Sequence, residues 1–269
     1  MSNLGDLNLH GARVVLRQRN VLDVVDLAMR FVALHGRAYA WLSLLVLVPS
    51  AAVTWLIGEG AGWGWGWFAG FFLSLLAGAP FTVLASRLMF TDKVRTRDVL
   101  LAALRTVPRL IVARVVQTIS VGLAAFFFVL PAAWVQALLL FLPEVLLLEQ
   151  AKVIPAMARA GRIAHAQVGN VVIGVLLMTA FTFGTPFLVD ACGRMLLDGL
   201  LEVHPPDALT SAGGGALSTL GFWMAVPFVT TIRFLLYIDL RTRTEGWDIQ
   251  TRFAALAART YPQDEGALA

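Results

Sequence analysis

Three charged side chains lie inside stretches that are otherwise apolar: Arg114, Glu144 and Arg233. A charged residue at the centre of a membrane-spanning helix costs about 2.5 to 3.5 kcal/mol on insertion scales, so its presence indicates a specific role. Glu144 and Arg114 are about equally far from a turn near residue 130, which gives them similar depths on adjacent antiparallel helices. Arg233 is the alternative partner, because it also lies shortly before the end of its apolar stretch. The sequence therefore predicts an ion pair between Glu144 and one of the two arginines.

This charge cluster has two interpretations. In the first, the three side chains form a structural lock near one membrane surface, with the arginines reaching toward that surface. In the second, they line a transport pathway. The apolar stretches contain no second carboxylate or histidine that would extend a proton path through the membrane, and this favours the lock.

Membrane-spanning helices must position the cluster. The chain is 58% hydrophobic and 14% charged, whereas soluble domains are about 45 to 50% apolar and about 25% charged. An apolar stretch of about 20 residues is long enough to cross a bilayer. We predict an all-α, polytopic integral membrane protein with six transmembrane helices in three hairpins, at 37–58, 65–89, 110–130, 132–150, 168–189 and 213–240.

Amphipathic segments accompany these spans. Residues 20–36, 91–109 and 151–167 each precede a hairpin and place apolar residues at helical spacing beside charged ones. Residues 245–259 follow the last span with the same pattern. Each apolar stripe is too short to cross a bilayer, so we predict four interfacial helices that lie on the membrane surface.

The order of elements repeats along the chain. An amphipathic helix, a span, a short turn and a second span follow one another three times, at 20–90, 91–150 and 151–240. We therefore predict a single transmembrane domain over 1–260, built from three quasi-repeats, and a flexible tail over 261–269.

The positive charges predict the orientation. Of the 21 lysines and arginines, only Arg194 falls on the side away from the N-terminus, in a predicted outer loop at 190–211. The positive-inside rule then places both termini and the amphipathic helices in the cytoplasm of a bacterial cell, at its inner membrane. The basic helices predict contact with anionic lipids of the inner leaflet. A net charge of +4 beside the spans does not predict nucleic-acid binding.

Prolines and glycines fall inside the predicted spans. Broken helices can frame the binding site of a transporter, but prolines are also common as simple kinks in membrane helices. No matching pair of unwound segments is evident, so kinks are favoured. Gly62, Gly66 and Gly70 have the four-residue spacing that permits close contact between helices. Five spans carry a proline, at Pro49, Pro80, Pro143, Pro186 and Pro227.

Catalytic motifs are missing from the sequence. The histidines at 10, 35, 165 and 204 do not have the spacing of metal ligands, and Cys192 is the only cysteine. No nucleophile elbow, phosphate-binding loop or dinucleotide fingerprint is present. We predict that the protein is not an enzyme and uses no cofactor or metal.

A polar motif follows the last span. Its predicted functional residues are Tyr237, Asp239, Arg241, Arg243, Glu245 and Asp248. Tyr237 is expected to anchor the span at the membrane surface, the arginines to face the inner leaflet, and the two acidic residues at 245 and 248 to complement the dipole at the start of the last amphipathic helix.

This motif, with the N-terminal segment VLDVVDLAMRF, resembles a group of bacterial six-span membrane proteins. The group is labelled glycerophosphodiester phosphodiesterase membrane-domain-like, or related to YciC-type membrane proteins. The resemblance implies a membrane module without the catalytic domain, which serves beside other membrane proteins. We therefore predict a non-enzymatic subunit that scaffolds or binds membrane or cytoplasmic protein partners. The alternative is a transporter or channel for a small molecule or lipid that uses the kinked helices and the cluster of Glu144, Arg114 and Arg233.

Overall fold

The computed structural model describes residues 20–91, 94–204, 206 and 208–260, with the backbone alone for 245–260. Over these residues the protein is helical and contains no strand. Six helical segments are long and apolar enough to cross a membrane, which confirms the prediction of an all-α, multi-pass membrane protein. The predicted tail at 261–269 lies outside the described residues.

The spans follow the predicted order. They are α2 (Gly36–Ala61), α3 (Trp63–Leu88), α4 (Thr96–Phe127), α5 (Val129–Leu138) with α6 (Leu142–Leu148), α8 (Val168–Gly199) and α10 (Ala216–Thr260). The remaining helices are α1 (Val21–Leu34), α7 (Val153–Ala166) and α9 (Leu209–Ala212).

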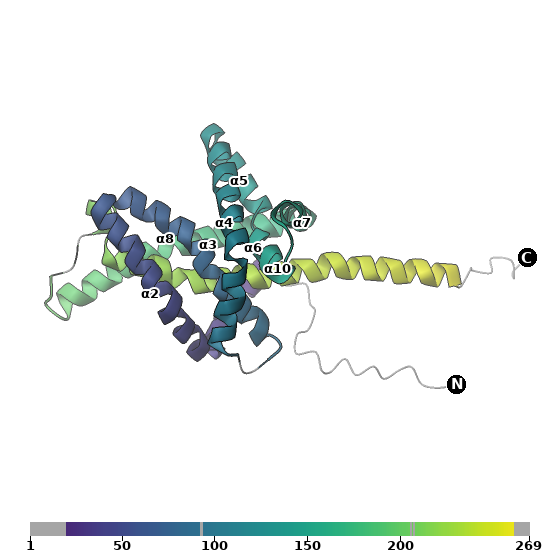
Figure 1. Cartoon of the computed structure of the whole chain (residues 1–269), viewed down its shortest axis with the longest axis horizontal. Coiled ribbons are helices and arrows are strands. Elements are labelled where there is room, and N and C mark those ends of the chain that lie inside the picture. The colour runs from purple at the N-terminus through teal and green to yellow at the C-terminus, as the bar shows by residue number, and fades with distance from the viewer. Residues whose placement is uncertain (1–19, 92–93, 205, 207, 261–269) are drawn as a thin grey trace, which may run out of the picture.

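Helix α10 forms the centre of the bundle, where it packs against α8, α3, α1 and α2 (Figure 1). In its most apolar stretch 72% of the residues are buried inside the protein, against 17% in α4. Small residues allow this central position. At Gly221 an added Cβ atom would lie 2.6 Å from the carbonyl oxygen of Thr185, so the backbones of α10 and α8 are in direct contact.

Helices α2 and α3 pack together just as closely. A Cβ atom added to Gly66 would lie 2.8 Å from the Cα atom of Gly58, and one added to Gly70 would lie 3.2 Å from Cγ2 of Thr54. The turn between the two helices is at Gly62, whose φ of 97° is a conformation that favours glycine. The spacing of Gly62, Gly66 and Gly70 permits close helix contact, and the structure shows such contact at Gly66 and Gly70 but not at Gly62, which lies in the turn.

Helices α1 and α7 have the same design. Each has 14 residues and joins the following span through one residue, His35 for α1 and Gln167 for α7. One apolar face of α1 is buried, including Val24 and Ala28, whereas Leu22 and Leu34 are exposed, and α1 packs mainly against α10. Packing on the bundle therefore explains the amphipathic pattern of α1. Binding of these helices to a lipid surface stays a prediction.

Three spans are longer than predicted. Residues 91–109 do not form a separate amphipathic helix, because from Thr96 they continue into the span as α4, which has 32 residues. Helix α8 runs beyond residue 189 to Gly199, so much of the predicted outer loop is helical. Helix α10 continues through 245–260 and extends away from the bundle at the right of Figure 1. In all three cases the helix continues through charged residues, so the charges alone did not mark where the helix ends.

The fourth span is broken, which is a correction to the single helix predicted at 132–150. Residues 139–141 separate α5 from α6. Pro143 lies in the first turn of α6. A backbone N–H group there has no partner within the helix, so the N–H that proline lacks costs no helical hydrogen bond. The break places Glu144 at the start of a new helix in the interior of the protein.

Candidate functional site

A cavity of about 530 Å³ lies among α3, α4, α5, α8 and α10. Its size falls within the range of about 300 to 1,000 Å³ that is typical of small-molecule sites. Most of its wall is apolar and aromatic, including Phe71 and Phe222. Its polar side chains include Arg114, Gln117, Gln136, Thr182, Thr230 and Arg233.

The buried ion pair joins Glu144 to Arg233. The Nε atom of Arg233 donates to Oε1 of Glu144 at 2.5 Å, from the central helix α10 to the first turn of α6. The Glu144 side chain has no exposed area, and that of Arg233 is 13% exposed. Glu144 is therefore neutralised by a direct, charge-assisted hydrogen bond. This settles which of the two arginines is the partner.

Arg114 makes different contacts. Its Nη2 atom donates to the carbonyl oxygen of Phe71 on α3, and its Nη1 atom lies 3.4 Å from Oε1 of Gln117. Gln117 in turn donates to Gln136 at 3.2 Å, which links α4 to α5. Arg114 is thus held at the cavity wall by neutral groups, and the structure does not bring it into an ion pair with Glu144.

The cavity carries excess positive charge. Arg114 and Arg233 both line it, and none of the described lining residues is acidic. Glu144 forms the ion pair with Arg233 but does not itself line the cavity. The two arginines lie on different helices, α4 and α10, and line the same cavity. Because like charges repel strongly where water is scarce, this wall of the cavity is electropositive.

Some hydrogen-bonding capacity at the site is unused. Among the described residues, Nη2 of Arg233, Nε of Arg114 and Oε2 of Glu144 are buried and have no hydrogen-bond partner. An unpaired buried polar atom costs about 1 to 3 kcal/mol, and more when the group is charged. A functional role is one of the explanations for such atoms in a native structure.

A second polar cluster lies one turn further along α10. The hydroxyl group of Tyr237 donates to Oε1 of Glu149 at 2.6 Å, Nε of Arg159 lies 2.6 Å from Oε2 of Glu149, and Nη1 of Arg241 lies 3.5 Å from its Oε1. Arg233, Tyr237 and Arg241 follow one another at four-residue spacing, so they share one face of α10. This face therefore fastens α6 and α7 to the central helix.

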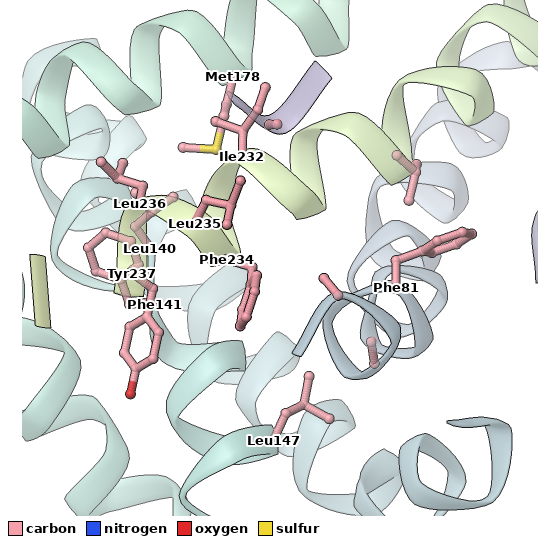
Figure 2. Close-up of a cluster of buried hydrophobic side chains, with 14 of the residues drawn as sticks. Phe81, Leu140, Phe141, Leu147, Met178, Ile232, Phe234, Leu235, Leu236 and Tyr237 are labelled. Atoms are coloured by element: carbon pink, nitrogen blue, oxygen red, sulfur yellow. The ribbon is translucent and has the colours of Figure 1, made fainter. Parts of the chain in front are cut away.

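Tyr237 is not the lipid-facing anchor that the sequence predicted. It is fully buried, and its ring lies 5.9 Å from the ring of Phe141 at the α5–α6 break. Figure 2 shows Tyr237 and Leu236 of α10 together with Leu140 and Phe141 of this break in one buried cluster. The apolar surroundings of the ring override the preference of tyrosine for a membrane surface.

The rest of the predicted motif is placed in part. Nη2 of Arg243 lies 2.7 Å from Oδ2 of Asp239 one turn earlier on α10, so this arginine is engaged within its own helix. The side chains of Glu245 and Asp248 lie outside the described ones. They belong to the continuous helix α10, so they do not start a separate helix as predicted.

Sequence analysis missed Gln117, Gln136, Glu149 and Arg159. The signal for the glutamines was present, because both are polar residues inside apolar spans. Glu149 and Arg159 stand on either side of the α6–α7 connection, and only the tertiary structure brings their side chains together.

Polar groups also meet at the far end of α8. Asp190 pairs with Arg194 at 3.1 Å and accepts a hydrogen bond from the backbone of Leu209 at 3.3 Å. These contacts explain how Asp190 is accommodated at a buried position within a helix. In the part of the chain that the structure describes, no group of His, Cys, Asp and Glu side chains comes together that could hold a metal ion.

The chain matches no protein-family model, no curated protein and no solved structure with which it was compared. Its resemblance to the six-span bacterial membrane proteins therefore stays a prediction.

Proposed function

We propose that this integral membrane protein binds a small amphiphilic molecule among its spans and moves it within or across the bilayer, as a transporter of a lipid or lipid-like compound. The observation that carries the proposal is the cavity of about 530 Å³, which has apolar walls and two arginines. A binding site of this composition suits a molecule with one polar and one apolar part.

The position of the cavity supports an approach from the bilayer. Phe68 of α3 and Phe183 of α8 line the cavity, yet they are 53% and 52% exposed. Both side chains belong to helices that are long and apolar enough to cross a membrane, so we propose that their exposed surface faces lipid. An acyl chain could then reach the cavity along them without exposure to water.

The broken fourth span supports movement. Leu140 lies in the break and lines the cavity. Broken helices beside a binding site are a recurring feature of transporters, where the two halves can shift separately. The ion pair between Glu144 and Arg233 connects the second half of this span to the central helix, so the predicted lock and the predicted transport site are parts of one arrangement.

The proposal is tested by filling the cavity. Gly122 is an exposed residue of the cavity wall, and nothing lies within 4 Å of the position where its Cβ atom would be, so a tryptophan can be placed there without a backbone clash. Gly184 of α8 is the matched control, because it also faces open space and does not line the cavity. A photoreactive lipid in nanodiscs should label the wild-type protein and Gly184→Trp equally, and Gly122→Trp about tenfold less. Equal labelling of all three proteins would exclude the cavity as the binding site.

A second function, the predicted partner-binding subunit, is favoured by the length of α10. Helix α10 continues past its most apolar stretch to Thr260 and extends from the bundle (Figure 1). The sequence of this extension has apolar residues at helical spacing, which suits a groove on another protein. Purification of the full chain in mild detergent should retain a stoichiometric partner, and a chain that ends at Thr244 should lose it. Retention by both chains would exclude the extension as the binding element.

Both functions are non-enzymatic, and both place the protein in the inner membrane of a bacterium with its termini in the cytoplasm. Six crossings put the segments before α2 and after α10 on the same side of the membrane. The positive residues concentrate on that side, which supports the cytoplasmic assignment. Contact of this basic side with anionic lipids follows from the same charges.

A further inference from the structure

We infer that the molecule bound in the cavity carries a single negative charge on a head group with two or more oxygen acceptors, as in a fatty-acid carboxylate or a lipid phosphodiester. The inference rests on the proposed function and names the substrate class of that site. It comes from the charge balance of the cavity and from the two arginines that line it.

The charge balance comes first. Arg114 and Arg233 contribute two positive charges to the cavity, and Glu144 contributes one negative charge behind Arg233. No other acidic side chain among the described residues lines the cavity, so its wall retains one net positive charge. A monoanionic head group would neutralise this charge. A zwitterion or a neutral alcohol would leave this positive charge uncompensated.

The donor geometry points to the same class. Nη2 of Arg233 and Nε of Arg114 are buried donors without a partner among the described residues. Each arginine also has one fixed contact, with Glu144 for Arg233 and with the carbonyl oxygen of Phe71 for Arg114. The two arginines line the cavity from different helices, and guanidinium groups bind the oxygens of carboxylate and phosphate groups well.

The remaining surface of the cavity fits the apolar part of the molecule. Phe71, Phe222 and Val226 line it near the polar groups, and Phe68 and Phe183 continue it toward the lipid. The head group would lie between α4 and α10 while its chain extends toward α8. The cavity thus selects an amphiphile, because a free inorganic anion would leave the apolar wall unfilled.

The test uses the full chain in nanodiscs of phosphatidylcholine. Either phosphatidylglycerol or palmitate is added as the anionic probe, and hexadecanol serves as the neutral probe. Binding is measured by the displacement of a photoreactive lipid. Arg114→Gln removes one positive charge. Arg114→Lys keeps the charge but replaces the planar guanidinium group, with its several N–H donors, by a single ammonium group. Arg162→Gln removes a positive charge from an exposed position on α7 and is the control. Arg114 is preferred to Arg233, since a change at Arg233 would strand Glu144.

We expect the wild-type protein and Arg162→Gln to bind one anionic probe at least about tenfold more tightly than hexadecanol. Arg114→Gln should lose most of this preference while its affinity for hexadecanol changes less than about twofold, and Arg114→Lys should recover part of it. The stronger of the two anionic probes identifies the head group as carboxylate or phosphodiester. A thermal unfolding midpoint for each variant separates loss of the site from loss of the fold.

Two results would overturn the inference. Equal binding of the anionic probes and hexadecanol, with no effect of Arg114→Gln, would show a site that does not distinguish charge, and the proposed function would survive. If no probe displaced the photoreactive lipid and Gly122→Trp labelled like the wild type, the proposed function itself would fail together with the inference.

Discussion

The α2–α3 and α8–α10 contacts and the cavity between α4 and α8 represent two opposite ways of packing membrane helices. At the first two contacts glycines bring backbones together, as at Gly66 and Gly221, and no side chain would fit between them. Around the cavity the spans are held apart, and a glycine such as Gly122 has only open space beside it. Glycine therefore allows close backbone contact in one region and lies beside open space in the other.

The polar residues differ between the two regions in the same way. Between α2 and α10 two buried pairs are neutral: Tyr39 contacts Thr231 at 2.9 Å, and Trp223 donates to Thr54 at 3.2 Å. Around the cavity Arg114 and Arg233 are charged, and each has a buried nitrogen atom without a partner among the described residues. Close packing with satisfied neutral pairs stabilises the fold, whereas charged groups with spare capacity are expected at a binding site.

The largest effect should come from breaking a glycine contact. In Gly221→Leu the new side chain must occupy the space of the α8 backbone, since even its Cβ atom would lie 2.6 Å from the carbonyl oxygen of Thr185. We expect a loss of at least about 3 kcal/mol in the free energy of unfolding, measured by reversible denaturation in mixed detergent micelles. Gly122→Leu makes the same change beside the cavity and should alter it by less than about 0.5 kcal/mol. Similar losses in both variants would contradict the distinction between the regions.

The next effect concerns the ion pair that borders the cavity. Glu144→Gln leaves Arg233 as an uncompensated charge in the interior and should lower the free energy of unfolding by about 2 kcal/mol, because a hydrogen bond to the amide can remain. Arg233→Gln should cost about as much or more. The double variant should be more stable than the two losses added together predict, by at least about 1 kcal/mol.

The same cycle separates the lock from a direct transport role. If Glu144 acts only by holding Arg233, Glu144→Gln should weaken the binding of the anionic probe no more than the accompanying loss of stability explains. Complete loss of lipid movement in a variant with unchanged unfolding would instead assign Glu144 to transport itself.

The sequence predicted the spans and the main charged residues because these depend on composition and local spacing. Six apolar stretches, the glycine contact of α3 with α2 and the pairing of Glu144 with an arginine all follow from such patterns. The break at 139–141 was not predictable from Pro143 alone, because most prolines in these spans leave the helix unbroken, as Pro227 does in α10. The choice of Arg233 over Arg114 follows neither from sequence depth nor from helix packing, because α4 packs against α6 and yet Arg233 of α10 makes the ion pair.

The cavity was beyond sequence analysis for a related reason. Free volume arises where helices fail to meet, and no residue pattern states how far α4 stands from α8. Composition did show Arg114, Gln117 and Gln136 as isolated polar residues in apolar spans. Only the tertiary structure shows that all three side chains line the same cavity.

The smallest expected effect comes from replacing one threonine in each region by valine and comparing the two losses of stability. Thr54 is fully buried, and its hydroxyl accepts from Trp223, so Thr54→Val leaves the indole N–H unpaired and should cost about 1 to 2 kcal/mol of unfolding free energy. Thr182 is half-buried at the cavity and its hydroxyl only donates to the carbonyl oxygen of Met178 in its own helix, so Thr182→Val should cost less than about 0.5 kcal/mol. The same denaturation assay measures both variants, with Thr182→Val also assayed for binding of the anionic probe. An equal loss of stability at the two sites would mean that the cavity wall is as tightly packed as the glycine contacts, and the contrast on which the proposed site depends would no longer hold.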